Sequence, residues 1–282
     1  MALTMTLADS LQLTTDTLQA GVIETLGQES KILAVLPFMD IQGSGYSYNV
    51  EKELSNTKFR AVGEAIDAGH AGWETRTEAL KILGDEAIID TFQIATYGNI
   101  TDLMSLEVGL KVKAMAHKFE KTFISGDKTV NANEFDGIDV RIADGQTKEV
   151  ESITAEALDE LIDAIQGTPS ALVMNKTARR KFTAAYREFI DKRVNDFGVQ
   201  VSTYGGIDII DLESEVLESE EVVYAVKFAP KEGVCGLTNG GVQVKSLGEV
   251  DNAPQLKTRI EWFVGLAVFN DKAIAKATVT AP

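Results

Sequence analysis

The longest apolar repeat in the chain limits what this protein can fold into. Between residues 101 and 125, apolar side chains recur at steps of four and three and form a stripe on one side of a helix: Met104, Val108, Val112, Met115, Phe119 and Phe123. Thr101 can cap the start of this helix, and Ser125-Gly126 can end it. Burying six large apolar side chains is worth on the order of 9–18 kcal/mol as an upper bound. A substantial surface must therefore pack along the helix.

The composition is that of a globular protein. The chain has 282 residues, of which 44% are apolar and 25% charged, enough for one large or two modest domains. No apolar run is as long as a membrane span, and the N-terminus lacks the features of a secretory signal. The net charge of −16 argues against a dedicated nucleic-acid binder, which needs a basic face.

Before the long helix, the apolar pattern changes to one residue in two. We expect residues 1–42 to form an N-terminal arm whose first dozen or so residues are mobile until something holds them. From Gly43, apolar and polar residues alternate, and the alternation returns at residues 73–78. Residues 43–82 are therefore predicted to form an extended two-stranded loop. An isolated ribbon of this kind is barely stable in water, which indicates that it needs a neighbouring molecule.

After the long helix, patterns of helix and strand alternate. Thr154 and Asn175 are placed to cap two helices. The apolar faces expected for them are Leu158, Leu161, Ile162 and Ile165 in the first, and Ala178, Phe182, Ala185, Tyr186 and Phe189 in the second. Residues 171–174, 206–212 and 222–228 are predicted strands, so a compact domain with helices against a small sheet is expected.

The remaining residues are predicted to be mostly strand. Residues 83–98 suit a short helix or a strand that leads into the long helix. Gly240-Gly241 after Asn239 predicts a hairpin turn, and residues 256–279 are strand-like throughout, with Ile260, Trp262, Val264 and Leu266 on one face.

Motifs that carry catalytic or metal chemistry are missing from the sequence. His70 and His117 have no ligand spacing around them, no G-x-S-x-G elbow is present, and the Gly126–Lys128 stretch lacks the glycine spacing of a phosphate loop. Cys235 is the single cysteine and is expected to be a small buried apolar residue. The acidic run from Glu213 to Glu221 is expected to be solvated. We therefore assign no catalytic, cofactor-binding or metal-binding residue and predict that the chain is not an enzyme.

Four stretches, in order and spacing, resemble the tailed-phage major capsid proteins of the Hong Kong 97 fold. They are SKILAVLPFMDIQG (30–43); KFEKTFISGD with FDGID (118–139); ALVMNKTARRKF (171–182) with YGGIDIIDL (204–212); and RIEWFVGLAVFNDKAIAKATV (259–279). The resemblance implies an α+β, Hong Kong 97-like fold. Its parts would be an N-terminal arm (1–42), an extended loop (43–82), a peripheral domain with the long "spine" helix (83–140, helix about 101–125), an axial α/β domain (141–235) and terminal strands that return to the peripheral domain (236–282).

The resemblance also implies a function. We expect a major capsid protein of a tailed bacteriophage or prophage that assembles through pentamers and hexamers into an icosahedral shell around packaged double-stranded DNA, without sequence-specific DNA binding. Expected partners are other copies of the chain and a portal protein. Because the arm begins close to Met1, we expect a separate scaffolding protein, or none. The expected location is the virion, after assembly in the host cytoplasm.

Two other functions stay open. One is the shell of an encapsulin-type nanocompartment, which has the same fold. The other is an acidic cytosolic enzyme with an unrecognised site in residues 141–235. One relative in the family also cross-links a loop lysine to a neighbour's asparagine. Candidates here are Lys52, Lys58, Asn252 and Asn270, all of which are also ordinary solvated residues.

Overall fold

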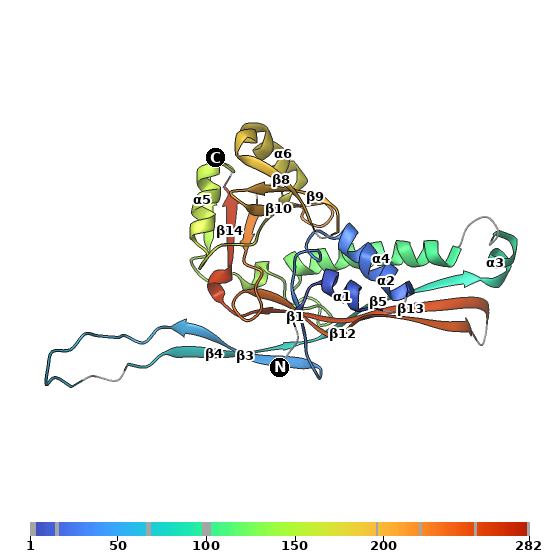
Figure 1. Ribbon diagram of the computed structural model, residues 1–282, viewed down its shortest axis with the longest axis horizontal. Helices are drawn as coiled ribbons and strands as arrows, with labels where there is room; N and C mark the ends of the chain where they lie inside the picture. The colour runs from blue at the N-terminus through green and yellow to red at the C-terminus, as the bar shows by residue number, and fades with distance from the viewer. Residues whose placement is uncertain are drawn as a thin grey trace.

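The predicted spine helix is α4, Leu103–Ser125, in the computed structural model (Figure 1). The model describes residues 4–14, 17–65, 69–97, 103–195, 197–219, 222–250 and 253–280, so the expected cap Thr101 lies outside the described residues. Val108, Val112, Met115, Phe119 and Phe123 are buried, as the apolar repeat predicts.

A five-stranded sheet lies against the spine helix. Its order is β1 (Thr4–Met5), β2 (Phe38–Asp40), β12 (Val234–Val250), β13 (Ala253–Val268) and β5 (Lys81–Asp90). Ile260, Trp262, Val264 and Leu266 of β13 are buried, and the Trp262 ring stacks on Phe119 at 5.4 Å between centroids. The surface expected to pack along the helix stripe is therefore this sheet, with β13 in contact with Phe119. We call this sheet, with α4, the peripheral sheet.

The start of the chain is held by its own subunit. Strand β1 pairs with β2, and helix α1 (Leu7–Leu13) begins with a capping box in which Thr6 and Asp9 bond each other's backbone. Leu7 is buried, and helix α2 (Thr17–Glu29) packs on α4 through Val22, Ile23 and Leu26. The first dozen residues were expected to be mobile until something holds them, and sheet pairing and apolar burial hold the described ones from Thr4 onward.

The prediction of a hairpin turn at Gly240-Gly241 was wrong. Strand β12 continues through these glycines, whose φ angles are 72° and 67°, and pairs with β13 on both sides of them. The register shifts between Thr238 and Val242, so the glycines form a bulge. Left-handed φ angles suit a bulge and a turn equally, and only the partner strand distinguishes the two.

A seven-stranded sheet forms the second layer of the molecule. Its order is β6 (Thr147–Val150), β14 (Ile274–Val279), β11 (Val222–Val226), β7 (Ala171–Asn175), β10 (Ile207–Leu212), β9 (Gln200–Tyr204) and β8 (Ile190–Val194). We expected β14 to return to the peripheral domain with β12 and β13. It instead pairs with β11 and β6, because the 3-10 turn Asp271–Ala273 redirects the chain out of the peripheral sheet.

Helices α5 (Ala155–Asp163) and α6 (Lys176–Ala185) share one buried cluster with the seven-stranded sheet. Thr154 and Asn175 cap them as predicted, by accepting hydrogen bonds from the backbone N–H groups of Ala157 and Thr177. Leu158, Leu161, Ile165, Ala178 and Phe182 face the sheet. Ala185 and Phe189 are exposed, against expectation, because α6 ends at Ala185 and the chain leaves through a 3-10 turn, Arg187–Phe189. The opposite face of the sheet joins the core around α4; there the 3-10 turn Asp139–Arg141 follows the spine helix.

The predicted extended loop is a two-stranded ribbon that projects from the molecule (Figure 1). Strands β3 (Gly45–Glu53) and β4 (Gly72–Ala79) pair antiparallel and form a sheet of their own. The stretch after it, predicted as helix or strand, contains both, since β5 is followed by α3 (Thr91–Tyr97). We call residues 45–79 the ribbon.

Candidate assembly surfaces

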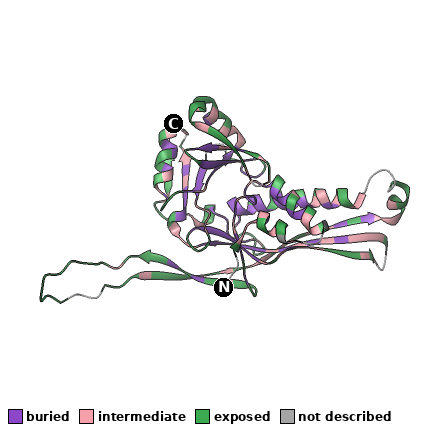
Figure 2. Ribbon diagram, in the orientation of Figure 1, coloured by how far each residue is buried: buried purple, intermediate pink, exposed green. Residues whose placement is uncertain are grey.

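The outer part of the ribbon has almost nothing of its own subunit to pack against. Beyond Glu53 and Gly72 the chain has no helix or strand in the described residues 54–65 and 69–71, and nearly all of it is exposed (Figure 2). Three large apolar side chains there face solvent, Leu54 (81% exposed), Phe59 (108%) and Val62 (104%), and Trp73 (71%) lies beside them at the start of β4. Apolar groups gathered on an exposed segment are typical of a surface that another molecule covers.

The base of the ribbon is, in contrast, part of the core. Tyr48 and Val50 are buried with Cys235 and Leu237 of β12, and the Tyr48 ring lies 4.6 Å from that of Phe269. The Tyr48 hydroxyl accepts a hydrogen bond from the Val268 N–H at 3.1 Å and donates one to Glu78 at 3.3 Å. Burial raises the pKa of this hydroxyl, with the Glu78 charge adding to the effect. The direction in which the ribbon leaves the molecule is therefore set by side-chain packing and hydrogen bonds.

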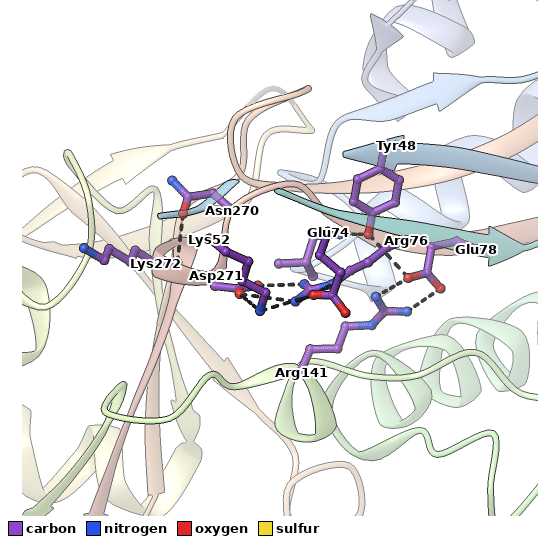
Figure 3. A network of polar contacts seen from close by, with 10 residues as sticks. Tyr48, Lys52, Glu74, Arg76, Glu78, Arg141, Asn270, Asp271 and Lys272 are labelled. Carbon is purple, nitrogen blue, oxygen red and sulfur yellow. Dashed lines mark hydrogen bonds and ion pairs between the residues drawn. The ribbon is translucent and has the colours of Figure 1, made fainter. Parts of the chain in front are cut away.

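Charged groups from three parts of the chain meet beside this base (Figure 3). The Arg141 guanidinium donates to both oxygens of Glu78, at 2.5 and 2.6 Å, and both side chains are nearly buried. Asp271 accepts from Arg76 at 2.6 Å and from Lys52 at 2.8 Å. We call these residues, with Glu74, the ribbon root: Tyr48, Lys52, Glu74, Arg76, Glu78, Arg141 and Asp271. The root joins the ribbon to the linker after the spine helix and to the turn before β14.

The pKa shifts in the ribbon root favour the charged state of each ion pair. Burial acts to raise the pKa of Asp271, but the hydrogen bonds from Arg76 and Lys52 outweigh it and lower the pKa. The pKa of Glu74 is also lowered, chiefly by its hydrogen bond with Lys52. The pKa of Lys52 is raised, chiefly by its hydrogen bond to Asp271.

The glycine loop after the spine helix packs against the end of that helix. The Gly137 N–H donates to the Gly126 carbonyl and the Ile138 N–H to the Phe123 carbonyl, each at 2.8 Å. A Cβ atom on Gly126 would lie 2.4 Å from the Phe135 carbonyl oxygen, and one on Gly137 2.6 Å from the Thr122 oxygen. The FDG motif therefore fits a place where two backbones touch, and it positions the linker that carries Arg141.

A second exposed apolar surface lies at the end of the molecule opposite the ribbon tip, around α3 and the start of α4 (Figure 1). Phe92 (70% exposed) and Tyr97 (57%) are on α3, and Leu106 (54%) and Leu110 (55%) are on α4. This surface and the ribbon place uncovered apolar groups at both ends of an elongated subunit, which is the arrangement expected of a subunit with neighbours on both sides.

Residues with catalytic potential are scattered. Among the described residues, no three His, Cys, Asp or Glu side chains are grouped to hold a metal ion. His70 and His117 are exposed, and Cys235 is buried, which raises the pKa of its thiol to about 12. In the part of the acidic run that is described, Glu213 pairs with Lys176 and Glu218 with Lys121. No helix in the described ranges is both long and apolar enough to cross a membrane.

The candidate cross-linking residues lie in different settings. Lys52 is held by Asp271 and Glu74 of its own subunit, whereas Lys58 is exposed near the ribbon tip. The Asn270 side chain accepts from the Lys272 N–H and donates to Gln166, and Asn252 lies outside the described residues.

Two long-range contacts escaped the sequence patterns. Arg141 and Glu78 are 63 residues apart, and neither stands in a motif. Glu120 lies outside the apolar stripe of the spine helix, yet it is 4% exposed and accepts a hydrogen bond from the Ser30 hydroxyl at 2.7 Å. Burial raises the pKa of Glu120, and this contact ties the N-terminal segment to the spine helix. The sequence gives little indication of this burial, because most carboxylates beside the apolar stripe of a helix reach solvent.

Comparisons with known proteins agree with this architecture. Residues 14–173 match the family model described as major capsid protein GP7. None of the curated proteins matches the chain in sequence.

Solved structures resemble the chain over most of its length. The SrpI encapsulin of Synechococcus elongatus PCC 7942 has a TM-score of 0.67 at 16% identity, over 89% of this chain and 87% of that one. The capsid of the native GTA particle has a TM-score of 0.66 at 13% identity, over 91% of each chain. Microbacterium phage Oxtober96 has a TM-score of 0.65 at 15% identity, over 90% and 91%.

Proposed function

Because the chain belongs to the family of the major capsid protein GP7 and has the Hong Kong 97 fold, we propose that it forms the head shell of a tailed bacteriophage or prophage. Family membership makes it a capsid shell protein, a structural component. The finer proposal is an icosahedral shell, built through pentamers and hexamers in the host cytoplasm, that encloses double-stranded DNA.

The observation that carries this proposal is the ribbon. Its base is packed into the core, yet its outer part exposes Leu54, Phe59 and Val62, and the adjoining Trp73 of β4 is exposed as well. Covering these side chains on a neighbouring subunit would recover roughly 1.5–3 kcal/mol for each one fully buried. Repeated over every subunit of a shell, contacts of this size add up to a stable particle although each is modest.

We propose roles for the parts of the subunit on the same basis. The arm (1–42) and the domain with the spine helix (83–140), together with β12 and β13, would form the rim that meets adjacent capsomers. The ribbon within residues 43–82 would lie over a neighbour. The seven-stranded sheet, within residues 141–235 and with β14 added from the terminal segment, would meet its copies at the centre of each capsomer.

Further partners belong to the proposal. They are a portal protein and a separate scaffolding protein, and DNA held without sequence-specific contacts. The net charge of −16 supports the last point, because an acidic shell does not grip a polymer that must slide in and out.

A second candidate is an encapsulin-type nanocompartment shell that holds a cargo protein. It is favoured by the similarity to the SrpI encapsulin, whose TM-score of 0.67 is slightly above the 0.65 of Microbacterium phage Oxtober96. A terminase or portal gene beside the coding sequence supports the phage head, whereas a gene for a cargo enzyme supports the nanocompartment.

Electron microscopy and sedimentation of the purified full chain test the proposal. We expect capsomers or closed shells, alone or with co-expressed neighbouring gene products. DNA within particles isolated from lysates supports the phage head, and a protein cargo supports the nanocompartment. A monodisperse monomer under every condition, with a tightly bound small molecule, overturns both and favours an enzyme.

A further inference from the structure

Two segments of the domain built on the seven-stranded sheet carry opposite charge. Residues 147–163, which contain β6 and α5, hold six carboxylates and one lysine, a formal charge of −5. Residues 176–194, which contain α6 and β8, hold seven basic and two acidic side chains, a formal charge of +5. We call them the acidic edge and the basic edge. In a chain whose net charge is −16, a local charge of +5 stands out.

The sheet topology separates the two edges. Strand β6 is the first and β8 the last of the seven strands, so about six spacings of ~4.8 Å place them roughly 29 Å apart. Helix α5 packs on β14, next to β6, and α6 packs on β7 and β10. Both helices bury their apolar sides against the same face of the sheet and turn their charged sides outward (Figure 2). The domain therefore carries a charge dipole from one end of its sheet to the other.

Several of these charges are not used within the subunit. Glu156, Glu160 and Asp163 of the acidic edge are exposed and form no ion pair with any residue that the structure describes. The same holds, over the described chain, for three cations of the basic edge: Arg180, Arg187 and Lys192.

Other cations of the basic edge are already paired internally. Lys176 pairs with Glu213, Arg179 with Asp211 at 3.3 Å and Arg193 with Asp208 at 2.5 Å. The unpaired cations therefore lie beside cations that are already paired, and a negatively charged partner could pair with the remaining ones.

The basic edge also exposes large apolar side chains. Phe189 is 61% exposed and Val194 62%, and both lie among its basic residues. An apolar contact ringed by charge is the usual composition of a protein–protein interface, whose centre is apolar and whose rim is polar. Binding of a bare polyanion would leave these two side chains uncovered.

Resting on the capsid function proposed above, we infer that the acidic edge of one subunit docks on the basic edge of a second copy of this chain. The two surfaces differ and lie at opposite ends of one sheet, so the contact is head-to-tail and can close into a ring. A two-fold contact of either edge with itself would bring like charges together. Charge complementarity therefore specifies both the partner and the rotational sense of the capsomer.

Charge reversal in the full chain tests this inference. One triple variant, Arg180→Glu with Arg187→Glu and Lys192→Glu, takes the formal charge of the basic edge from +5 to −1. The other, Glu156→Lys with Glu160→Lys and Asp163→Lys, takes that of the acidic edge from −5 to +1. Each therefore makes both edges alike in sign. Exposed ion pairs are individually weak. With three pairs turned from attraction to repulsion, we expect the concentration needed for capsomer formation at low salt to rise roughly tenfold or more. Glu215→Lys, an exposed position in the same domain outside both edges, is the matched control and should assemble like the wild type.

The variant with all six reversals decides between docking and a structural role. Its edges are again opposite in sign, so we expect capsomer formation at close to the wild-type concentration, with each variant's fold checked by circular dichroism. Assembly of the two triple variants at the wild-type concentration overturns the inference, and so does a sixfold variant as defective as the triples. Loss of binding to short duplex DNA by the triple variant of the basic edge, with assembly unchanged, also overturns it in favour of a polyanion site. Failure of the wild type to assemble at all counts against the capsid function instead.

Mixing the two triple variants gives a sharper readout. One has two acidic edges and the other two basic edges, so a head-to-tail ring must alternate between them and contain an even number of subunits. We expect hexamers, with tubes or open sheets, and no pentamers by electron microscopy. Closed icosahedral shells from the mixture, which need five-membered rings, contradict the inference.

Discussion

Gly126 and Gly137 lie where the last turn of the spine helix and the loop after it approach most closely. Neither glycine is needed for a left-handed backbone; each is needed because a Cβ atom would meet backbone oxygens at 2.4–2.6 Å. Side chains can move aside from a clash, but the carbonyls of Thr122 and Phe135 are fixed by the helix and the loop. The two positions thus hold the linker to Arg141 in place.

We predict that Gly137→Ala destabilises the subunit by about 1–3 kcal/mol, the usual cost of forcing an extra carbon into a filled site. Urea unfolding of the unassembled subunit would measure it. Gly109→Ala is the matched control, because a Cβ atom at that position meets nothing within 4 Å. Alanine also favours a helix more than glycine does, so the stability of this variant should be unchanged or slightly higher. Equal effects of the two substitutions would show that the close approach at Gly137 has no energetic weight.

A pH dependence of the ribbon root follows from the lowered pKa of Asp271. The folded pKa lies below the ordinary value of 3.8, so the contribution of Asp271 to stability is complete above that value and is lost as the pH falls through the folded pKa. We expect cleavage at the ribbon by an acid-active protease to rise as the pH falls below about 4. Asp271→Asn, which cannot ionise, should remove this contribution to the pH dependence. A ribbon equally protected at pH 6 and pH 3 would argue against it.

At the scale of elements, the ribbon divides into a seated base and a free outer part. The sequence predicted one extended loop over residues 43–82, but within it Val50 is fully buried and Lys52 and Glu74 belong to the ribbon root. The free part begins after Glu53 and ends before Gly72. The boundary between folding and assembly therefore lies a few residues further out than the alternating pattern indicates.

We predict that replacing residues 54–71 by an Asn-Gly turn leaves the subunit folded and abolishes stable shells. The Glu53–Gly72 pair would then be closed by a tight hairpin. Thermal unfolding should stay near that of the wild type while shells disappear from sedimentation profiles. Deleting residues 50–75 should in contrast lower the melting temperature by several degrees, because it removes a buried side chain. Normal shells from the shorter deletion would show that the ribbon tip is not an assembly contact.

Local patterns predicted elements well and partners poorly. The stripe from Val108 to Phe123, the caps at Thr154 and Asn175 and the alternation of β13 depend on neighbours a few residues away, and the sequence contains those. Whether Gly240-Gly241 makes a turn or a bulge, and which sheet receives β14, depends on strands far away in the chain. The same holds for the candidate surfaces: the ribbon was predictable as an uncovered hairpin, but the Arg141–Glu78 pair that fixes its base was not.

At the scale of the whole molecule, two sheets are joined through the turn that contains Asp271. The chain leaves the peripheral sheet after the spine helix, returns to it in β12 and β13, and leaves again for β14. Because Asp271 also binds the ribbon, the ribbon and both sheets meet at one turn. The relative placement of the three parts is thus decided within a few residues.

Covalent linkage between subunits is not expected from this geometry. An amine must lose its proton to attack an amide, and the pKa of Lys52 is raised by Asp271. We predict a single band near 30.5 kDa when assembled particles are boiled in detergent. A ladder of multimers would contradict this, and its loss in Lys58→Arg but not Lys52→Arg would assign the link to the ribbon tip.

The path of the chain also determines when a subunit can first bind another. Strand β14 lies between β6 and β11, so the seven-stranded sheet stays divided until residues 274–279 have been translated. The peripheral sheet likewise lacks its two longest strands until residue 268. Subunit contacts that need a complete sheet can therefore form only after residue 279 has been made. The order of synthesis thus places folding before assembly.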